Sequence, residues 1–284
     1  MRTMTPGERF MRCLNFESVD RIPVMDFGYW RETIDAWHKQ GLPAEVDSTE
    51  EVERYFGCDR GFETNLVNYW GDNGPVGIEW RAWPRELLGP ENLLISYYDD
   101  PDLIHAIQRN HTDFVKDWVD MVWEVTPLDY VCFFEDMAYN HGCFISPKTF
   151  DEFLMPYYHE LVAYLRAKGV KKVLVDSDGN SVQLTDKLVE AGADGHYPLE
   201  INSGAFPEEI RKRHPKLALI GGINKLALAQ DRAAIDKELS KLPPLLEQGG
   251  YIPSLDHRVQ PDVPMVNYHY YIEKKREIME KYCY

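Results

Sequence analysis

The segment KKVLVDSDGNSVQLTDKLVEAGADGHYPLE, residues 171–200, decides the fold. It opens with an apolar run typical of a buried strand, continues through a helical pattern (181–192) that ends on Gly192, and closes on a second strand-like run (194–200). A strand, a helix and a strand joined by short links predict parallel pairing with a right-handed crossover.

The first of these strands ends on Asp176 and Asp178, with Ser177 between them. Alternate side chains of a strand share a face, so the two carboxylates would point the same way and repel each other. A metal ion, a basic side chain or a shared proton between them would relieve this repulsion. The alternative is a solvated turn at Asp178-Gly179-Asn180, because all three residue types favour turns.

Apolar runs of the same kind recur along the chain and alternate with amphipathic stretches. The predicted strands are 21–27, 57–63, 75–80, 130–136, 171–178, 194–200, 216–223 and 249–256. Helices are predicted at 148–169, where Ser146-Pro147 form the start and Gly169 the end, at 181–192, and from Pro207 to residue 214. We therefore predict a single-domain (β/α)8 TIM barrel over residues 1–284. An open doubly wound sheet is the alternative, but no G-x-G-x-x-G follows the first strand.

Composition narrows the classes of function. The 31 basic and 47 acidic residues give a net charge of −16, which disfavours binding to nucleic acid or to an anionic membrane surface. No apolar stretch is long enough for a membrane span, and the N-terminal stretch lacks the apolar core of a signal peptide. Five cysteines without a CxxC pair argue against a disulfide framework, so we expect a cytoplasmic protein with reduced thiols.

Polar residues gather where the predicted strands end, and in a (β/α)8 barrel the active site is built at those ends. They are Asp26, Glu63, Glu135, Asp136, Asp176, Asp178, Glu200, Lys225, Asp256, His257 and Arg258. We expect these groups to converge at the same end of the barrel, which we call the mouth. Residues predicted to contact substrate are Asp26, Tyr29, Trp30, His141, Tyr197 and Arg258.

With VDSDGN (175–180), GHYPLEINSG (195–204), LIGGINK (219–225) and GGYIPSLDHRVQPDVP (249–264), the chain resembles the uroporphyrinogen decarboxylase superfamily. The resemblance runs from about residue 5 to residue 275 and implies a (β/α)8 barrel. The tetrapyrrole decarboxylases of this superfamily carry an arginine-rich loop after the first strand, where this chain reads RIPVMDFGYWRE (21–32). A carboxylate-rich porphyrinogen would meet acids there instead of arginines.

The resemblance also extends to the cobalamin-linked methyltransferases, which bind zinc through a His-x-Cys pair after the fifth strand and a Cys after the eighth. Aligned by motif, these positions hold Asp176, Asp178 and His257, which stands seven residues before Pro264. Glu200 occupies the position of the family's acidic residue. The family's soft metal ligands are all replaced in this chain, but the residues at those positions are polar.

The resemblance therefore implies a divalent metal ion, Zn²⁺ in the first place and Mn²⁺ or Fe²⁺ as alternatives, held by Asp176, Asp178 and His257. Glu200 would be a fourth ligand or a base. Further catalytic candidates are Glu135, Asp136 and Lys225.

Two other interpretations stay open. In a metal-free site, Arg258 or Lys225 would neutralise the acids and one carboxyl group of raised pKa would act as a general acid. In a purely structural network, the same groups would only hold loops together. The sequence also leaves open whether Asp256 or His257 faces the site.

The implied function is that of a metal-dependent, methyltransferase-like enzyme that moves a methyl group between a small substrate and a corrinoid carried by a partner protein. One alternative is a decarboxylase or lyase acting on a small carboxylate or tetrapyrrole. Another is a barrel that binds a corrinoid or tetrapyrrole without catalysis. A homodimer is compatible with each of them.

Overall fold

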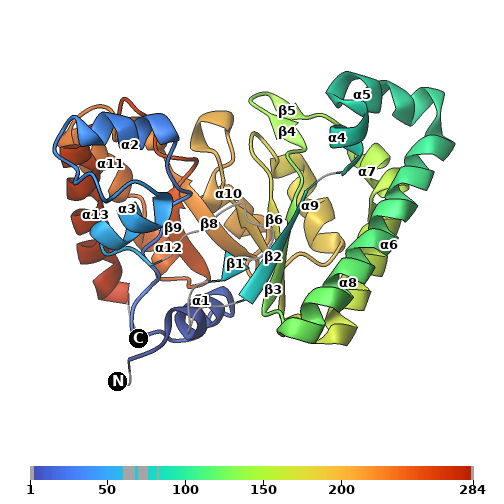
Figure 1. Ribbon diagram of the computed structural model, residues 1–284, viewed down its shortest axis with the longest axis horizontal. Coiled ribbons are helices and arrows are strands. Elements are labelled where there is room, and N and C mark those ends of the chain that lie inside the picture. Colours follow the sequence, from blue (N-terminus) through green and yellow to red (C-terminus); the bar gives the residue numbers. More distant parts are fainter. Residues whose placement is uncertain (1–2, 60–67, 70–75, 82, 283–284) are drawn as a thin grey trace.

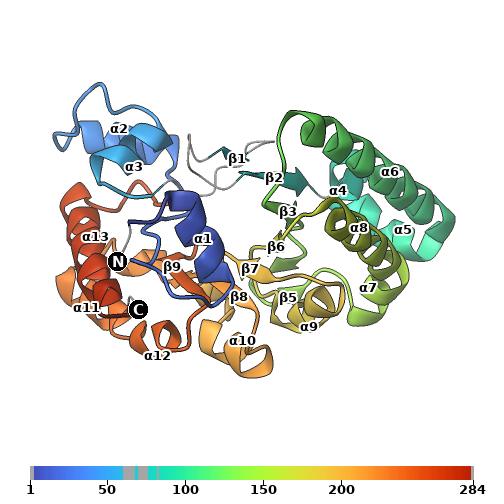
Figure 2. The same cartoon turned by 90° about the horizontal axis from the view of Figure 1, so that it is seen from below.

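The computed structural model describes residues 3–59, 68–69, 76–81 and 83–282, and Figures 1 and 2 show it from two perpendicular directions. The strands lie in the middle, with the long green helices α6 and α8 on one flank and the red and blue helices α11, α13 and α2 on the other (Figure 2). Helices therefore cover the strands from two sides.

The main sheet has the order β1-β2-β3-β6-β7-β8-β9, in which only the β1–β2 pairing is antiparallel. Its strands are β1 (Asn68–Tyr69), β2 (Val76–Arg81), β3 (Tyr130–Phe134), β6 (Lys172–Asp176), β7 (Gly195–Tyr197), β8 (Ala218–Ile223) and β9 (Tyr251–Leu255). A separate hairpin pairs β4 (Ala138–Tyr139) with β5 (Gly142–Cys143). The described part of the chain is thus an α/β protein with a parallel sheet.

The helices fill the connections between these strands. They are α1 (Pro6–Leu14), α2 (Arg31–His38), α3 (Thr49–Tyr55), α4 (Trp83–Leu88), α5 (Pro90–Asp99), α6 (Pro101–Val125), α7 (Pro147–Phe153), α8 (Met155–Lys168), α9 (Val182–Glu190), α10 (Pro207–Arg213), α11 (Arg232–Leu239), α12 (Pro243–Leu246) and α13 (Met265–Met279). Short 3₁₀ turns are η1 (Ile201–Ser203), η2 (Lys225–Ala227) and η3 (Glu280–Tyr282). No helix in the part of the chain that the structure describes could cross a lipid bilayer.

Six of the eight predicted strands are confirmed, namely those that became β2, β3, β6, β7, β8 and β9. The predicted helix 148–169 is divided into α7 and α8 at Leu154, directly before Met155-Pro156, because Pro156 has no N–H to continue the hydrogen-bond ladder. Its predicted ends are confirmed: the Ser146 side chain accepts the Thr149 N–H, and Gly169 ends α8 in the left-handed region.

The prediction of a strand at 21–27 is wrong in its pairing. The segment runs beside β9, but the Leu255 N–H donates to the Asp26 side chain, and an isolated backbone bridge pairs Tyr29 with Val259 just after the segment. Pro23 removes another ladder donor. In the predicted strand 57–63, Asp59 donates to the Val24 carbonyl outside any strand, whereas 60–63, with Glu63, lie outside the described residues.

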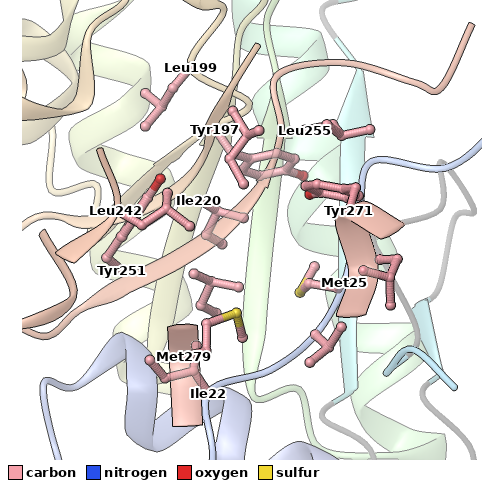
Figure 3. Packing of buried hydrophobic residues seen from close by; sticks show 14 of the residues in the cluster. Ile22, Met25, Tyr197, Leu199, Ile220, Leu242, Tyr251, Leu255, Tyr271 and Met279 are labelled. Atoms are coloured by element: carbon pink, nitrogen blue, oxygen red, sulfur yellow. The ribbon is translucent and has the colours of Figure 1, made fainter. Parts of the chain in front are cut away.

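The alternation of side chains divides the core in two. Tyr130 and Cys132 of β3 belong to a cluster with β7, β8, β9 and the terminal helices, whereas Val131 and Phe133 pack toward α6, α7 and α8. Figure 3 shows part of the first cluster, with Met25, Tyr197 and Ile220 among its members. The two faces of the strands thus serve two separate cores.

The position of Gly221 in β8 requires glycine. Its φ is +113°, and a Cβ atom there would lie 1.6 Å from the Pro198 carbonyl oxygen. Only glycine lets the backbone after β7 approach β8 this closely. This contact fixes the loop that carries Glu200.

Candidate functional site

Three carboxylates meet where β3 and β6 end, on the side of the sheet that carries the β4–β5 hairpin at the top of Figure 1. Each of Asp136, Asp176 and Asp178 places a carboxylate oxygen so that the three atoms lie within 4.8 Å of one another. We call these three residues the acidic group. Because β3 and β6 are parallel neighbours, their ends bring together residues that are 40 positions apart in sequence.

Local backbone geometry directs these side chains. Asp176 continues the inward face of Leu174, while Asp136 follows β3 with a φ of +45°, an unusual value for a residue other than glycine. The turn after Asp178 packs on the hairpin: a Cβ at Gly179, whose φ is +76°, would lie 2.7 Å from Ala138 backbone atoms. Asp178-Gly179-Asn180 is therefore a turn, and this turn positions Asp178 in the acidic group.

Positive charge near the acidic group is limited. The Arg85 guanidinium donates to the Asp136 carboxylate at 3.2 Å, and the Nε2 atom of His257 lies 3.4 Å from Asp178 Oδ2. Burial, together with the Asp178 charge, raises the pKa of Asp136 despite Arg85. Asp178 Oδ1 is buried and has no hydrogen-bond partner among the described residues. These oxygens and the imidazole are a donor set that fits a divalent cation.

The structure places His257, rather than Asp256, at the mouth. His257 Nδ1 accepts the Arg258 N–H at 2.8 Å, which leaves Nε2 directed to Asp178, and the ring lies 5.7 Å from the rings of both Phe27 and Trp30. Asp256 is fully buried.

The buried Asp256 joins two loops. Its carboxylate accepts the backbone N–H groups of Ile201 and Lys225 at 3.1 and 3.0 Å. Burial raises the pKa of Asp256 to about 6. Asp256 therefore connects the loops that follow β7 and β8.

Glu200 and Lys225 form an ion pair beside the acidic group. Glu200 Oε1 accepts from Lys225 Nζ at 2.9 Å, and Oε2 accepts the Gly179 N–H at 2.8 Å. Burial favours the neutral acid, but the Lys225 ammonium and the Gly179 N–H outweigh it and lower the pKa of Glu200. Lys225 thus neutralises Glu200, which in turn positions the turn after Asp178.

Glu135 turns away from the acidic group, toward the helices. The Tyr158 hydroxyl of α8 donates to its carboxylate, and burial raises the pKa of Glu135 to about 7. It lines a cavity of about 280 Å³ whose wall comes mostly from α4, α5 and the hairpin region. Both acids after β3 therefore line this cavity, and Asp136 also belongs to the acidic group.

Burial corrects the prediction of substrate contact for three residues, Asp26, Tyr29 and Tyr197. Asp26 accepts from Leu255, Tyr268, Tyr271 and Lys275 and has a side chain 1% exposed.

The other two are tyrosines. Tyr29 is buried, with its hydroxyl 2.6 Å from that of Tyr268. Tyr197 is buried with its hydroxyl 2.8 Å from Cys132 Sγ. All three side chains belong to the core below the mouth.

The other predicted contacts lie at the surface of this end of the molecule. Trp30 is 40% exposed, and the Arg258 guanidinium lies 5.3 Å from its ring centroid. His141 is exposed on the β4–β5 hairpin, 6.0 Å from the Tyr139 ring, and takes no part in the acidic group.

Two residues near the site were not predicted. Arg85 of α4 reaches Asp136 across 51 positions, and Gln108 of α6 lines the cavity beside Glu135. Both belong to helices whose sequence carries no sign of a site, so only the packing of those helices reveals them.

Comparison with known proteins places the chain among related sequences. The family model described as uroporphyrinogen decarboxylase (URO-D) matches residues 86–278. Uroporphyrinogen decarboxylases from Campylobacter fetus and Aliarcobacter butzleri are 27% and 25% identical over 190 residues each, which are 66% and 65% of this chain. The alignments cover 52% and 51% of those proteins, so the chain spans about half the length of the curated relatives it matches.

A solved structure, a methyltransferase from Methanosarcina mazei, superposes with a TM-score of 0.71. The alignment covers 96% of this chain and 99% of that one, at 14% identity. This likeness shows a common fold, which is that of the TIM-barrel family.

Proposed function

Because the chain belongs to the uroporphyrinogen decarboxylase (URO-D) family, we propose that it is a metal-dependent, methyltransferase-like enzyme of that family. It moves a methyl group between a small substrate and a corrinoid on a partner protein. Its scaffold is a (β/α)8 barrel in which the segment 21–27 takes the place of the first strand. The observation that carries the proposal is the acidic group, three carboxylates within 4.8 Å of one another at the ends of two neighbouring strands.

The acidic group favours a cation over a shared proton alone. Asp178 Oδ1 is buried without a hydrogen-bond partner among the described residues, which costs free energy unless a ligand contacts it. Asp136, Asp176 and Asp178 would hold a Zn²⁺, Mn²⁺ or Fe²⁺ ion, with His257 beside them. Such an ion supplies Lewis acidity toward a substrate heteroatom.

The surrounding residues fix the acidic group in place. Arg85 holds Asp136, and the Glu200–Lys225 pair holds the turn after Asp178 through the Gly179 N–H. His257 Nε2 lies 3.4 Å from Asp178 Oδ2, at the edge of the same group. Pre-organised ligands of this kind lower the free-energy cost of binding.

A second function is supported by a separate observation. The pKa of Glu135 is raised to about 7 by burial, which suits a proton donor or acceptor near neutral pH. A decarboxylase or lyase would use such a group without any metal. The acids at the mouth would then act through protons alone.

Metal analysis distinguishes the two functions. We expect about one Zn²⁺, Mn²⁺ or Fe²⁺ per chain in protein purified without chelator, measured by plasma mass spectrometry. Asp178→Asn should weaken binding of the ion by about 100-fold or more, because even indirect support of a metal ligand is worth about 10- to 100-fold. Asp262→Asn, at an exposed aspartate, is the matched control and should change nothing.

Two results would contradict the metal proposal. One is no bound metal after the protein is supplied with all three ions. The other is equal metal content in Asp178→Asn and the control. Either result would favour proton chemistry, and turnover by neither route would favour a non-catalytic binding protein.

A further inference from the structure

The cavity beside the acidic group is nearly all apolar. It measures about 280 Å³, and its apolar wall includes Leu93, Leu94, Tyr97, Met137 and Phe144. A cavity of about 150 Å³ is enough to hold benzene. The present cavity therefore has room for one substituted ring.

One polar group in this cavity lacks a partner. Gln108 of α6 is 8% exposed, and its side-chain amide makes no hydrogen bond within the described part of the chain. The cavity does not fully shield this amide from water, so a ligand that fills the cavity has to offer the amide a donor or an acceptor in place of water. An ether, hydroxyl or carbonyl oxygen would satisfy its N–H.

The charged groups on the wall favour a neutral ligand. Arg85 and Asp136 are bonded to each other at 3.2 Å, and Glu135 accepts from Tyr158. A ligand carboxylate would meet the acids Glu135 and Asp136, and a ligand ammonium would meet Arg85. Among the wall residues described, neither a ligand carboxylate nor a ligand ammonium would find a group of opposite charge that is not already engaged.

We propose that this cavity binds a neutral, monocyclic compound whose single oxygen acceptor hydrogen-bonds the Gln108 amide. Asp136 belongs both to the wall and to the acidic group, so the bound molecule lies next to the place where a cation would be held. That this compound is the substrate rests on the proposed function. The binding itself involves no bond making or breaking.

Calorimetric titration without divalent cations tests the cavity apart from the metal. We expect anisole to bind, toluene to bind about three- to tenfold more weakly because it lacks the oxygen, and benzoate not to bind. Gln108→Leu should lower the anisole affinity to that of toluene. Gln183→Leu, at an exposed glutamine on α9, is the control.

Filling the cavity tests the location. Leu94→Trp should abolish binding of both anisole and toluene, and Leu93→Trp serves if the first variant melts at a much lower temperature. The inference is overturned if anisole does not bind, if benzoate binds equally well, if Gln108→Leu has no effect, or if a folded tryptophan variant still binds. Anisole binding in a protein that takes up no metal would leave this inference standing and overturn the proposed function.

Discussion

At the scale of single residues, the acidic residues that follow the strands have different roles. Asp136, Asp176 and Asp178 meet at the mouth, whereas Asp26 is enclosed in the core. Lys275 Nζ donates to Asp26 Oδ1 at 3.1 Å and to the Met25 carbonyl at 3.0 Å, with no exposed side-chain surface. A charge pair buried this deeply stabilises only while both partners are present.

We predict that Lys275→Met lowers the free energy of unfolding by about 3–5 kcal/mol, because it leaves the Asp26 carboxylate buried without its ammonium partner. Urea denaturation followed by circular dichroism measures this. Lys274→Met, at the neighbouring, more exposed lysine of α13, should leave the free energy of unfolding nearly unchanged. Equal losses in the two variants would refute the role of the buried pair.

At the scale of elements, a buried histidine joins β7 to the start of α9. His196 Nε2 lies 3.1 Å from Ser181 Oγ, and Nδ1 lies 3.5 Å from Thr185 Oγ1. Burial lowers the pKa of His196 from 6.5 to about 4. The imidazole is therefore neutral in the folded protein at pH values where it is protonated in the unfolded chain.

The sign of the pH effect follows from this difference. Above pH 6.5 both states hold neutral His196; as the pH falls toward 4, only the unfolded state gains a proton, so stability is lost. We predict a loss of about 2 kcal/mol from this group between pH 7 and pH 5. Unfolding free energies of His196→Gln should show a correspondingly flatter dependence in that range.

The exposed His269 of α13 provides the comparison. His269→Gln should retain the pH dependence of the unmodified protein, because its imidazole is more than half exposed. If the two variants have the same slope, the effect does not come from burial of His196.

At the scale of the whole molecule, five of the exposed apolar side chains described lie on the β4–β5 hairpin or on segments outside the main sheet and the α-helices. They are Trp30, Tyr139, Phe144, Phe206 and Leu226, between 37% and 48% exposed. Exposed aromatic side chains often anchor protein interfaces. Under the proposed function, we predict that side chains of this set contact the corrinoid-carrying partner.

We predict that Tyr139→Ser raises the KM for the partner-bound corrinoid by about fivefold or more, since an aromatic anchor is typically worth more than 1 kcal/mol. Methyl transfer to free cobalamin should be unchanged, because the ring would contact the protein and not the reacting atoms. Tyr55→Ser, with the same 48% exposure but at the end of α3, is the control. An equal effect on both acceptors would place Tyr139 in the active site instead.

The sequence by itself determined the strands of the main sheet from β2 onward and the helical segments that became α7 to α10. Apolar runs, a capping serine and a terminal glycine act locally, so 130–136 and 171–178 could be recognised without any contact partner. It also indicated Asp176, Asp178 and Asp136 as site residues, because acids directly after buried strands are uncommon.

Only the tertiary structure decided how these acids are used. Burial and long-range hydrogen bonds separate Asp26 and Asp256, which hold the fold, from Asp136, which faces the mouth. Lys275 lies 249 positions from Asp26, and Arg85 lies 51 positions from Asp136 along the chain. A local pattern carries no information on such contacts, because they depend on how strands and helices far apart in sequence pack together.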